Sequence, residues 1–217
     1  MNYYFATYIS CASVLLPLAT IVIRRKRVGK DYLPLALLIV AATLNEGLGF
    51  IGDFHASVGC AIGNVYVLFE LLLILWLYHR IGLTFTYKLL IGFVIIAGSV
   101  WLLDNLVFHS LRANNSTFRM IASLMIVFIA IDKLHLLLLF HGKPQVRDPE
   151  MLITFSFLLY FVYKTFVEAY HLFPVPHQRS FYRILWMIMN VINTITNIIL
   201  ALGIVCIRPK TRHFMHS

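Results

Sequence analysis

Charged side chains are scarce in this sequence. Asp, Glu, Lys and Arg together make up only 12% of its 217 residues, whereas hydrophobic residues make up 60%. The mean hydropathy of +0.84 is also far above that of a soluble domain. In soluble domains about a quarter of the residues are charged, roughly twice the fraction found here. This composition excludes a soluble globular protein and predicts an integral membrane protein.

Cysteines are also few and far apart. Cys11, Cys60 and Cys206 form no CxxC pair, so the sequence supports neither a disulfide framework nor a zinc ribbon. We expect inert thiols in apolar surroundings.

The polar stretches between the apolar segments are short. A bilayer core of roughly 30 Å needs about 20 apolar residues per helix, and seven segments approach that length. They comprise residues 5–23, 32–51, 61–78, 87–103, 120–140, 151–170 and 184–207. The longest stretch between them, residues 104–119, is too short for a soluble domain. We therefore predict an all-α polytopic membrane protein, with a single seven-helix transmembrane domain over residues 1–217.

The Lys and Arg residues are distributed unevenly between the predicted loops. Twelve lie on the side that includes the basic run 24–30 (RRKRVGK) and the C-terminal tail, and four lie on the opposite side. Basic residues concentrate in cytoplasmic loops of membrane proteins, so we predict an N-terminus outside and a C-terminus in the cytoplasm. The formal net charge of +9 is then a topology signal that also attracts anionic membrane lipids. We expect no binding of nucleic acid.

One proline interrupts a predicted span. Pro17 lies inside the first segment, where it removes a helical hydrogen bond and should kink the helix.

Ionisable side chains lie within several predicted spans, although a charged group at the bilayer centre costs at least about 2.5 kcal/mol. Glu70 lies near the middle of the third span, and Glu46 occupies the outer third of the second. Lys164 and Glu168 are four residues apart on the sixth span, hence on one face, with Tyr160 one turn further in. Each of these groups needs a charged partner, a wet cavity or a position near the surface.

The seventh span carries a stripe of amides. Asn190, Asn193 and Asn197 follow one another at spacings of three and four residues, which places them on one helical face. We expect a polar chamber lined by the second, third, sixth and seventh spans, with Glu46 and Glu168 nearer its outer mouth. The structural alternative is that these groups only join helices, at roughly 0.6 kcal/mol per hydrogen bond.

Three further ionisable residues, Asp132, Lys133 and His135, lie in the inner part of the fifth span. We expect them to extend to the cytoplasmic surface, because long side chains near a helix end carry their charges into water.

Motifs of known intramembrane enzymes are missing. The last span has neither the lysine of retinal proteins nor an HxxxH zinc pair, and the serines stand in no GxSxG or SxxK context. A metal site at the outer face is a weaker hypothesis. Glu168 and His171 are three residues apart and have ligand chemistry that suits zinc, and His55 is a further candidate. We expect no bound cofactor.

Three stretches carry a resemblance. They are GNVYVLFELLLILWLYHR, LITFSFLLYFVYKTF and LWMIMNVINTITNIILALGI. Together they resemble a group of small uncharacterised seven-helix bacterial membrane proteins, which have an Asn-Tyr-Glu run in one helix and a final helix running from Trp to Asn. Members of that group often have a lysine near the final Asn run, where this chain has Thr196. The resemblance implies a bacterial inner-membrane protein with a sensor or accessory role beside signalling kinases.

Two functions compete on these grounds. The first is a non-enzymatic ligand-sensing or signalling module that acts on a cytoplasmic or membrane partner, or as a homo-oligomer. The second is a transporter or channel for protons or a small polar solute, with Glu70 as the titrating group. An intramembrane metal-dependent enzyme is a remote third. The segment 198–206 (IILALGIVC) is almost wholly apolar, which favours sensing, because a transporter needs polar groups that continue to the cytoplasm.

Overall fold

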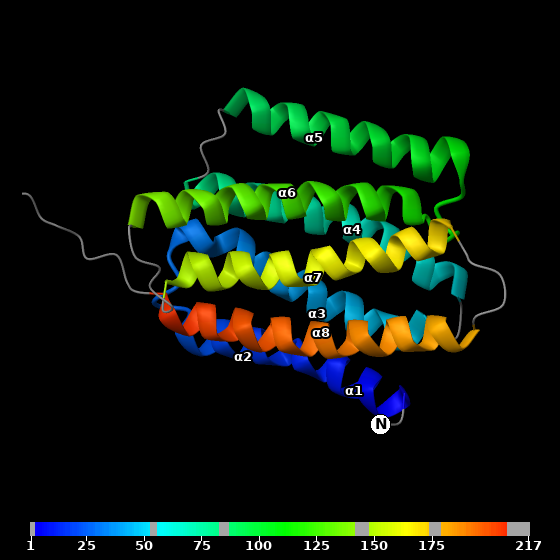
Figure 1. The fold of residues 1–217 in the computed structure, drawn as a ribbon, viewed down its shortest axis with the longest axis horizontal. Coiled ribbons are helices and arrows are strands. Elements are labelled where there is room, and N and C mark those ends of the chain that lie inside the picture. The colour runs from blue at the N-terminus through cyan, green and yellow to red at the C-terminus, as the bar shows by residue number, and fades with distance from the viewer. Residues whose placement is uncertain (1–2, 53–55, 83–86, 142–147, 174–178, 208–217) are drawn as a thin grey trace, which may run out of the picture.

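The secondary structure is helical in the part of the chain that the computed structural model describes, residues 3–52, 56–82, 87–141, 148–173 and 179–207 (Figure 1). In chain order its elements are α1 (Tyr3–Ser13), α2 (Leu15–Arg24), the short 3-10 helix η1 (Lys30–Tyr32), α3 (Leu33–Gly52), α4 (Ala56–Arg80), α5 (Tyr87–Leu102), the π-helix η2 (Leu103–Phe108), α6 (Ser116–His141), α7 (Pro149–Leu172) and α8 (Arg179–Cys206). Seven segments are long and apolar enough to cross a membrane. This confirms the predicted all-α, seven-span fold.

The first span is broken, as its proline predicts. Helix α1 ends at Ser13 and α2 begins at Leu15. Pro17 has no N–H to donate to the carbonyl of Ser13, four residues earlier. Helical hydrogen bonding resumes with the bond from Leu18 N to Val14 O at 3.4 Å. Together α1 and α2 make one candidate span, Phe5–Arg24.

The segment that connects the fourth and fifth spans is shorter than the sequence predicts. Residues 104–119 were expected to form a loop, but η2 continues the fourth span to Phe108 and α6 begins at Ser116. The polar side chains of Asp104 and Asn105 are helical and buried because they find partners: Asp104 Oδ2 accepts a hydrogen bond from the backbone N of Phe118 at 2.9 Å. The connection between the two spans is therefore only residues 109–115.

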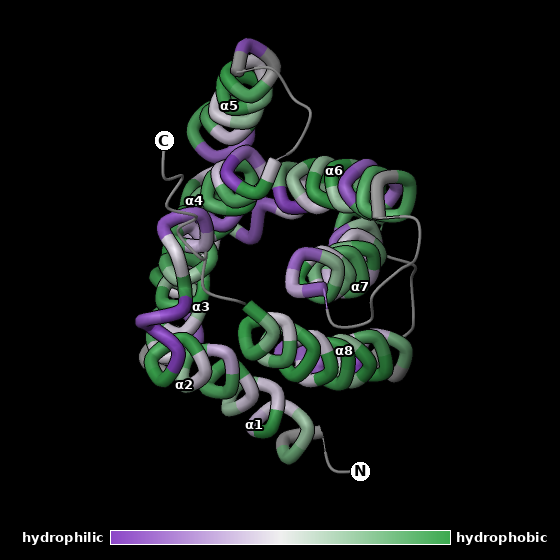
Figure 2. The backbone as a smooth tube through the Cα atoms, turned by 90° about the vertical axis from the view of Figure 1, so that its left-hand side faces the viewer, coloured by the Kyte–Doolittle hydropathy of each residue, from purple (hydrophilic) through white to green (hydrophobic). Residues whose placement is uncertain are grey.

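Helix α7 lies between α6 and α8. It packs against both of them, and the view along the bundle in Figure 2 shows it between these two helices, with α5 at the edge beside α4. Helix α3 packs on α4, and both α1 and α2 pack on α8. The apolar core includes Leu35, Leu71, Ile74, Ile153 and Ile204, each with 0% exposed surface.

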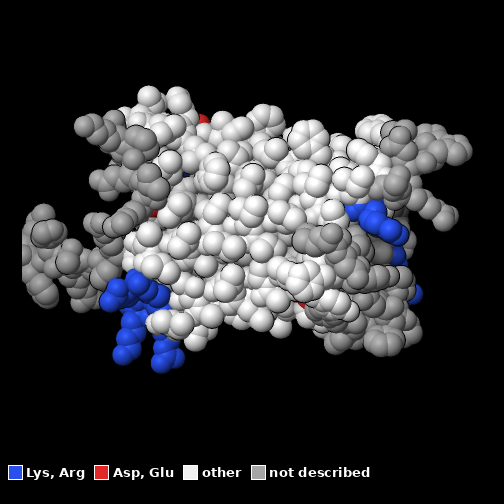
Figure 3. Space-filling view, turned by 60° about the horizontal axis from the view of Figure 1, so that its bottom comes forward, with Lys and Arg blue, Asp and Glu red and all other residues white. Residues whose placement is uncertain are grey.

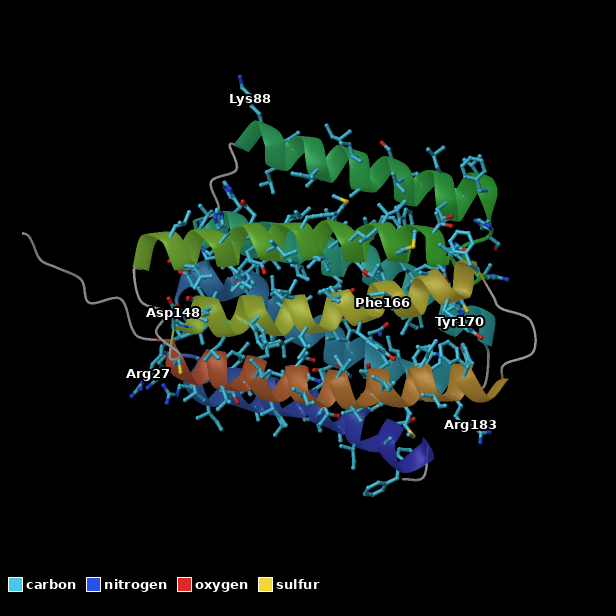
Figure 4. All side chains as sticks on the ribbon, viewed as in Figure 1. Arg27, Lys88, Asp148, Phe166, Tyr170 and Arg183 are labelled. Carbon is cyan, nitrogen blue, oxygen red and sulfur yellow. The ribbon has the colours of Figure 1, made fainter. Side chains whose placement is uncertain are left out.

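The outside of the bundle is apolar along its length and charged at its ends. Phe69, Phe128 and Phe166 are more than half exposed, as expected of side chains that contact lipid. Figure 3 shows Lys and Arg gathered at the ends, away from the middle of the visible face. Figure 4 places Arg27 and Asp148 at one end of the bundle, which we call the basic end. It places Tyr170 and Arg183 at the opposite end, which we call the loop end. The assignment of the basic end to the cytoplasm stays a prediction.

Candidate functional site

A cavity of about 120 Å³ lies within the bundle, lined by α2, α3, α4, α7 and α8 together with Val14. Its polar lining residues are Asn45, Glu46, Tyr66, Glu70, Ser156, Tyr160, Asn193, Thr196 and Asn197. The structure thus brings five candidates from the sequence, Glu46, Glu70, Tyr160, Asn193 and Asn197, to one space among the four expected spans. The first span, which was not expected there, contributes Val14 and Pro17. Binding of a ligand by these residues stays a prediction.

Glu70 and Lys164 form a buried ion pair between α4 and α7. Lys164 Nζ lies 2.6 Å from Glu70 Oε2, and the hydroxyl of Tyr66 donates to Glu70 Oε1 at 3.1 Å. The ammonium also lies over the rings of Tyr160 and Phe161, 5.5 and 5.1 Å from their centroids. Both oxygens of Glu70 are therefore bonded, and the pair presents a neutral polar wall to the cavity.

Glu46 differs from Glu70 because its carboxylate is free. It lines the cavity from α3, and no hydrogen bond or ion pair joins it to another residue in the described part of the chain. The cavity therefore holds one carboxylate without a counter-ion of its own.

The asparagine stripe of α8 faces α1. Each amide nitrogen donates to a hydroxyl there: Asn190 to Thr7 at 3.0 Å, Asn193 to Ser10 at 2.9 Å and Asn197 to Ser13 at 2.8 Å. We call these three hydrogen bonds the amide ladder. The three hydroxyls of α1 were not predicted as partners of the asparagines. Their regular three-residue spacing indicates a polar face on the first span. The two amides Asn193 and Asn197 also line the cavity, so they both join helices and face the cavity.

Glu168 is not among the residues that line the cavity, and its expected position near the outer mouth stays a prediction. It is buried on α7 and faces α6, where Arg119 Nη1 lies 3.9 Å from its Oε1, while Oε2 has no partner among the described residues. Arg119, counted above as a loop residue, donates through Nε and Nη2 to Asn64 Oδ1 at 3.2 and 3.0 Å. A Cβ on Gly63 would lie 2.8 Å from Arg119 Nη2. Glycine at this position therefore makes room for the arginine.

The side chain of Asn64 binds the connection 109–115 at the loop end of the bundle. Its amide nitrogen donates to the carbonyls of Leu111 and Ala113 at 2.9 and 2.8 Å, and its own carbonyl accepts from Trp101 Nε1 at 2.9 Å. This hub explains the burial of an asparagine with 1% exposed surface. It ties the connection 109–115 to α4.

Lys133 does not reach the surface, contrary to the prediction from the sequence. Only 4% of the residue is exposed. Its ammonium donates to the carbonyl of Ile81 at 2.7 Å and pairs with Glu150 Oε2 at 2.7 Å. These bonds satisfy its charge inside the protein, and they join the ends of α4 and α6 to the start of α7. The group is a structural clamp at the basic end.

The metal candidates are not brought together in the described part of the chain. The ring of His171 packs edge-on against Tyr182 and Trp186, with centroid distances of 5.4 and 6.3 Å, whereas Glu168 faces Arg119. His55 lies outside the described residues. Over the residues that the structure describes, no group of three or more His, Cys, Asp or Glu side chains is placed to hold a metal ion.

Comparison with known proteins leaves the family open. No protein-family model, no curated protein and no solved structure matches this chain. Of the resemblance drawn from three stretches of sequence, the structure supports the coarse part, a seven-helix protein with seven candidate membrane spans. The chain is a polytopic membrane protein.

Proposed function

We propose that this protein is a non-enzymatic ligand-sensing or signalling accessory module of a bacterial inner membrane. A small polar ligand occupies the cavity, and a cytoplasmic or membrane partner responds to the resulting shift in helix packing. The observation that carries this proposal is the composition of the cavity lining, which is polar at Glu46, Glu70, Asn193 and Asn197 and mainly apolar towards the basic end, where Leu38, Ile74 and Leu200 lie. A site of this composition binds a solute without offering it a polar path onward.

The apolar part of the lining continues as a well-packed plug. Leu38, Ile74 and Leu200 line the cavity, and Ile204 and Ile207 follow towards the basic end with 0% and 3% exposed surface. Helices α7 and α8 approach closely here, since a Cβ on Gly203 would lie 3.0 Å from Ile153 Cγ1 and 3.4 Å from Ile153 N. Close packing of this kind excludes water and resists the passage of a polar solute.

The amide ladder gives a ligand a way to move α1. A ligand with an acceptor group that takes hydrogen bonds from the amides of Asn193 and Asn197 in the cavity would compete with Ser10 and Ser13, whose hydroxyls accept from these amides. The break at Val14 lies next to these hydroxyls, and α2 leads from there to the basic run 24–30, which is the natural contact for a cytoplasmic partner. A complete shift between two packings requires a difference in ligand affinity of about 5.5 kcal/mol.

Ion flux through vesicles tests this proposal. The purified protein is reconstituted in liposomes, and internal pH and ion release are followed under an imposed gradient for the wild type and for Glu70→Gln. We expect tight vesicles in both cases, because the plug closes the basic end. Flux in the wild type that disappears in a folded Glu70→Gln variant would overturn sensing and make Glu70 a carrier or gating residue.

The alternative, a transporter or channel for protons or a small polar solute, is favoured by one observation. Two buried hydroxyls near the plug, Tyr78 Oη and Thr154 Oγ1, have no geometrically satisfied hydrogen bond in the described part of the chain. Water that entered beside them would extend a polar path from Ser156 in the cavity lining towards the basic end. If flux is found, Thr154→Val should reduce it, because the substitution removes a hydroxyl from that path at nearly constant volume.

A further inference from the structure

The cavity carries an excess of negative charge. Two charged side chains line it, Glu46 and Glu70. Lys164 neutralises Glu70 across 2.6 Å and Tyr66 occupies its second oxygen, whereas Glu46 has no bonded partner in the described part of the chain. An ionised carboxylate in a membrane interior is stable only with a counter-ion or water. A cationic ligand supplies the missing charge, and an anionic ligand would be repelled.

Aromatic side chains contribute to the lining of the same cavity. Tyr66, Phe157, Tyr160 and Phe161 all line the cavity. Faces of aromatic rings attract cations, and organic ammonium ions most of all. The protein already uses two of these rings in that way, because the ammonium of Lys164 lies over Tyr160 and Phe161 at 5.5 and 5.1 Å.

The same lining disfavours a metal cation. Calcium takes six to eight oxygen ligands and magnesium requires a nearly complete octahedron, whereas the lining has only two carboxylates, and one of them, Glu70, is already paired with Lys164. The amides of Asn193 and Asn197 offer further polar contacts to a ligand that bears a hydroxyl or a second polar group. The chemistry of the walls therefore matches a soft, partly apolar cation of small size.

We infer that the cavity binds a small alkylammonium ion with Glu46 as its counter-ion, which assumes the ligand-binding role proposed above. The ammonium group lies beside the Glu46 carboxylate, and its alkyl groups contact Tyr66 and Phe157. The Glu70–Lys164 pair stays intact as a neutral wall.

Equilibrium dialysis of the full-length protein in detergent against radiolabelled tetramethylammonium measures this binding directly. We expect saturable binding to the wild type and a loss of affinity of about tenfold or more in Glu46→Gln, since a charged contact is removed at constant shape. Glu46→Asp, which keeps the charge, should retain part of the affinity. Asp132→Asn is the matched control, because it removes one carboxylate from α6, outside the cavity lining, and should leave the affinity unchanged.

Two outcomes would overturn the inference: no saturable tetramethylammonium binding to the wild type, or equal binding by wild type and Glu46→Gln. Preferential binding of radiolabelled acetate would overturn it as well. These results are separable from those of the flux test. Tetramethylammonium flux that Glu46→Gln abolishes would retain the alkylammonium site and overturn sensing, whereas tight vesicles without binding would leave sensing in place and remove the alkylammonium ligand.

Discussion

The most tightly coupled residues of this protein are Glu70, Lys164 and Tyr66. Burying an ion pair in an apolar interior is costly, and the mutual attraction offsets that cost only where geometry is good and the remaining atoms are hydrogen-bonded. Here the pair distance is 2.6 Å, the second carboxylate oxygen accepts from Tyr66, and the ammonium lies over two rings. Removing one member therefore leaves a buried charge without compensation, which is worse than removing both.

Lys164→Met should destabilise the protein by about 3 kcal/mol, because it leaves the Glu70 carboxylate unpaired. The double variant Lys164→Met with Glu70→Gln should recover most of that loss, since it removes both charges and keeps the volume. Thermal unfolding in detergent, followed by circular dichroism, gives the ranking of the variants. A double variant no more stable than Lys164→Met would contradict the assignment of a coupled pair.

At the scale of the element, the first span is the part whose geometry departs most from a regular helix. The break at Val14 divides the span, and all three hydroxyls of the amide ladder lie on the α1 side of it. Parallel α1 and α8 therefore meet along a polar seam, whereas α2 and the far half of α8 meet through apolar contacts. Polar seams between membrane helices contribute modestly to stability, at about 0.6 kcal/mol per hydrogen bond.

The amide ladder predicts coupling between Asn193 and Ser10. Asn193→Ala and Ser10→Ala should each destabilise by about 0.6 kcal/mol, and the double variant by less than their sum, because both remove the same hydrogen bond. Thr194→Val is the control on the same helix, since Thr194 donates to the carbonyl of Asn190 in its own helix at 2.9 Å, and it should show no coupling to Ser10→Ala. Full additivity of the Asn193 and Ser10 changes in unfolding measurements would argue against the ladder.

At the scale of the whole molecule, charge is sorted by depth. The run 24–30, which includes Arg27, lies at the basic end (Figure 4), near the buried Lys133–Glu150 pair, while the Glu70–Lys164 pair lies inside the bundle and Arg119 pairs with Glu168. A bundle with basic loops concentrated at one end inserts with that end in the cytoplasm. The predicted orientation therefore follows from how the charges are distributed over the molecule.

Labelling of single cysteines tests this orientation. In a variant with Cys11, Cys60 and Cys206 replaced by Ser, a new cysteine is placed either at Lys26 or at Arg112, both of which are exposed. A membrane-impermeant maleimide applied to intact bacterial cells should label Arg112→Cys, and Lys26→Cys only after the cells are opened. The reverse pattern would place the basic end outside and invert the expected side of the signalling partner.

The hydropathy of the sequence alone determined the number of spans and the all-α class, because a membrane helix satisfies its backbone within itself and depends little on distant contacts. The position of Pro17 likewise predicted the break in the first span. Candidate residues such as Glu46, Glu70 and the three asparagines were visible as polar side chains in apolar segments.

Only the tertiary structure decided which of these residues meet. Helical periodicity tells which side chains share a face, but the rotation and neighbours of each helix are set by packing of the whole bundle. That packing paired Glu70 with Lys164 across 94 residues and the stripe of α8 with hydroxyls more than 180 residues away. It also turned Glu168 towards Arg119, buried Lys133 against Glu150, and placed Glu46 in the lining of the cavity.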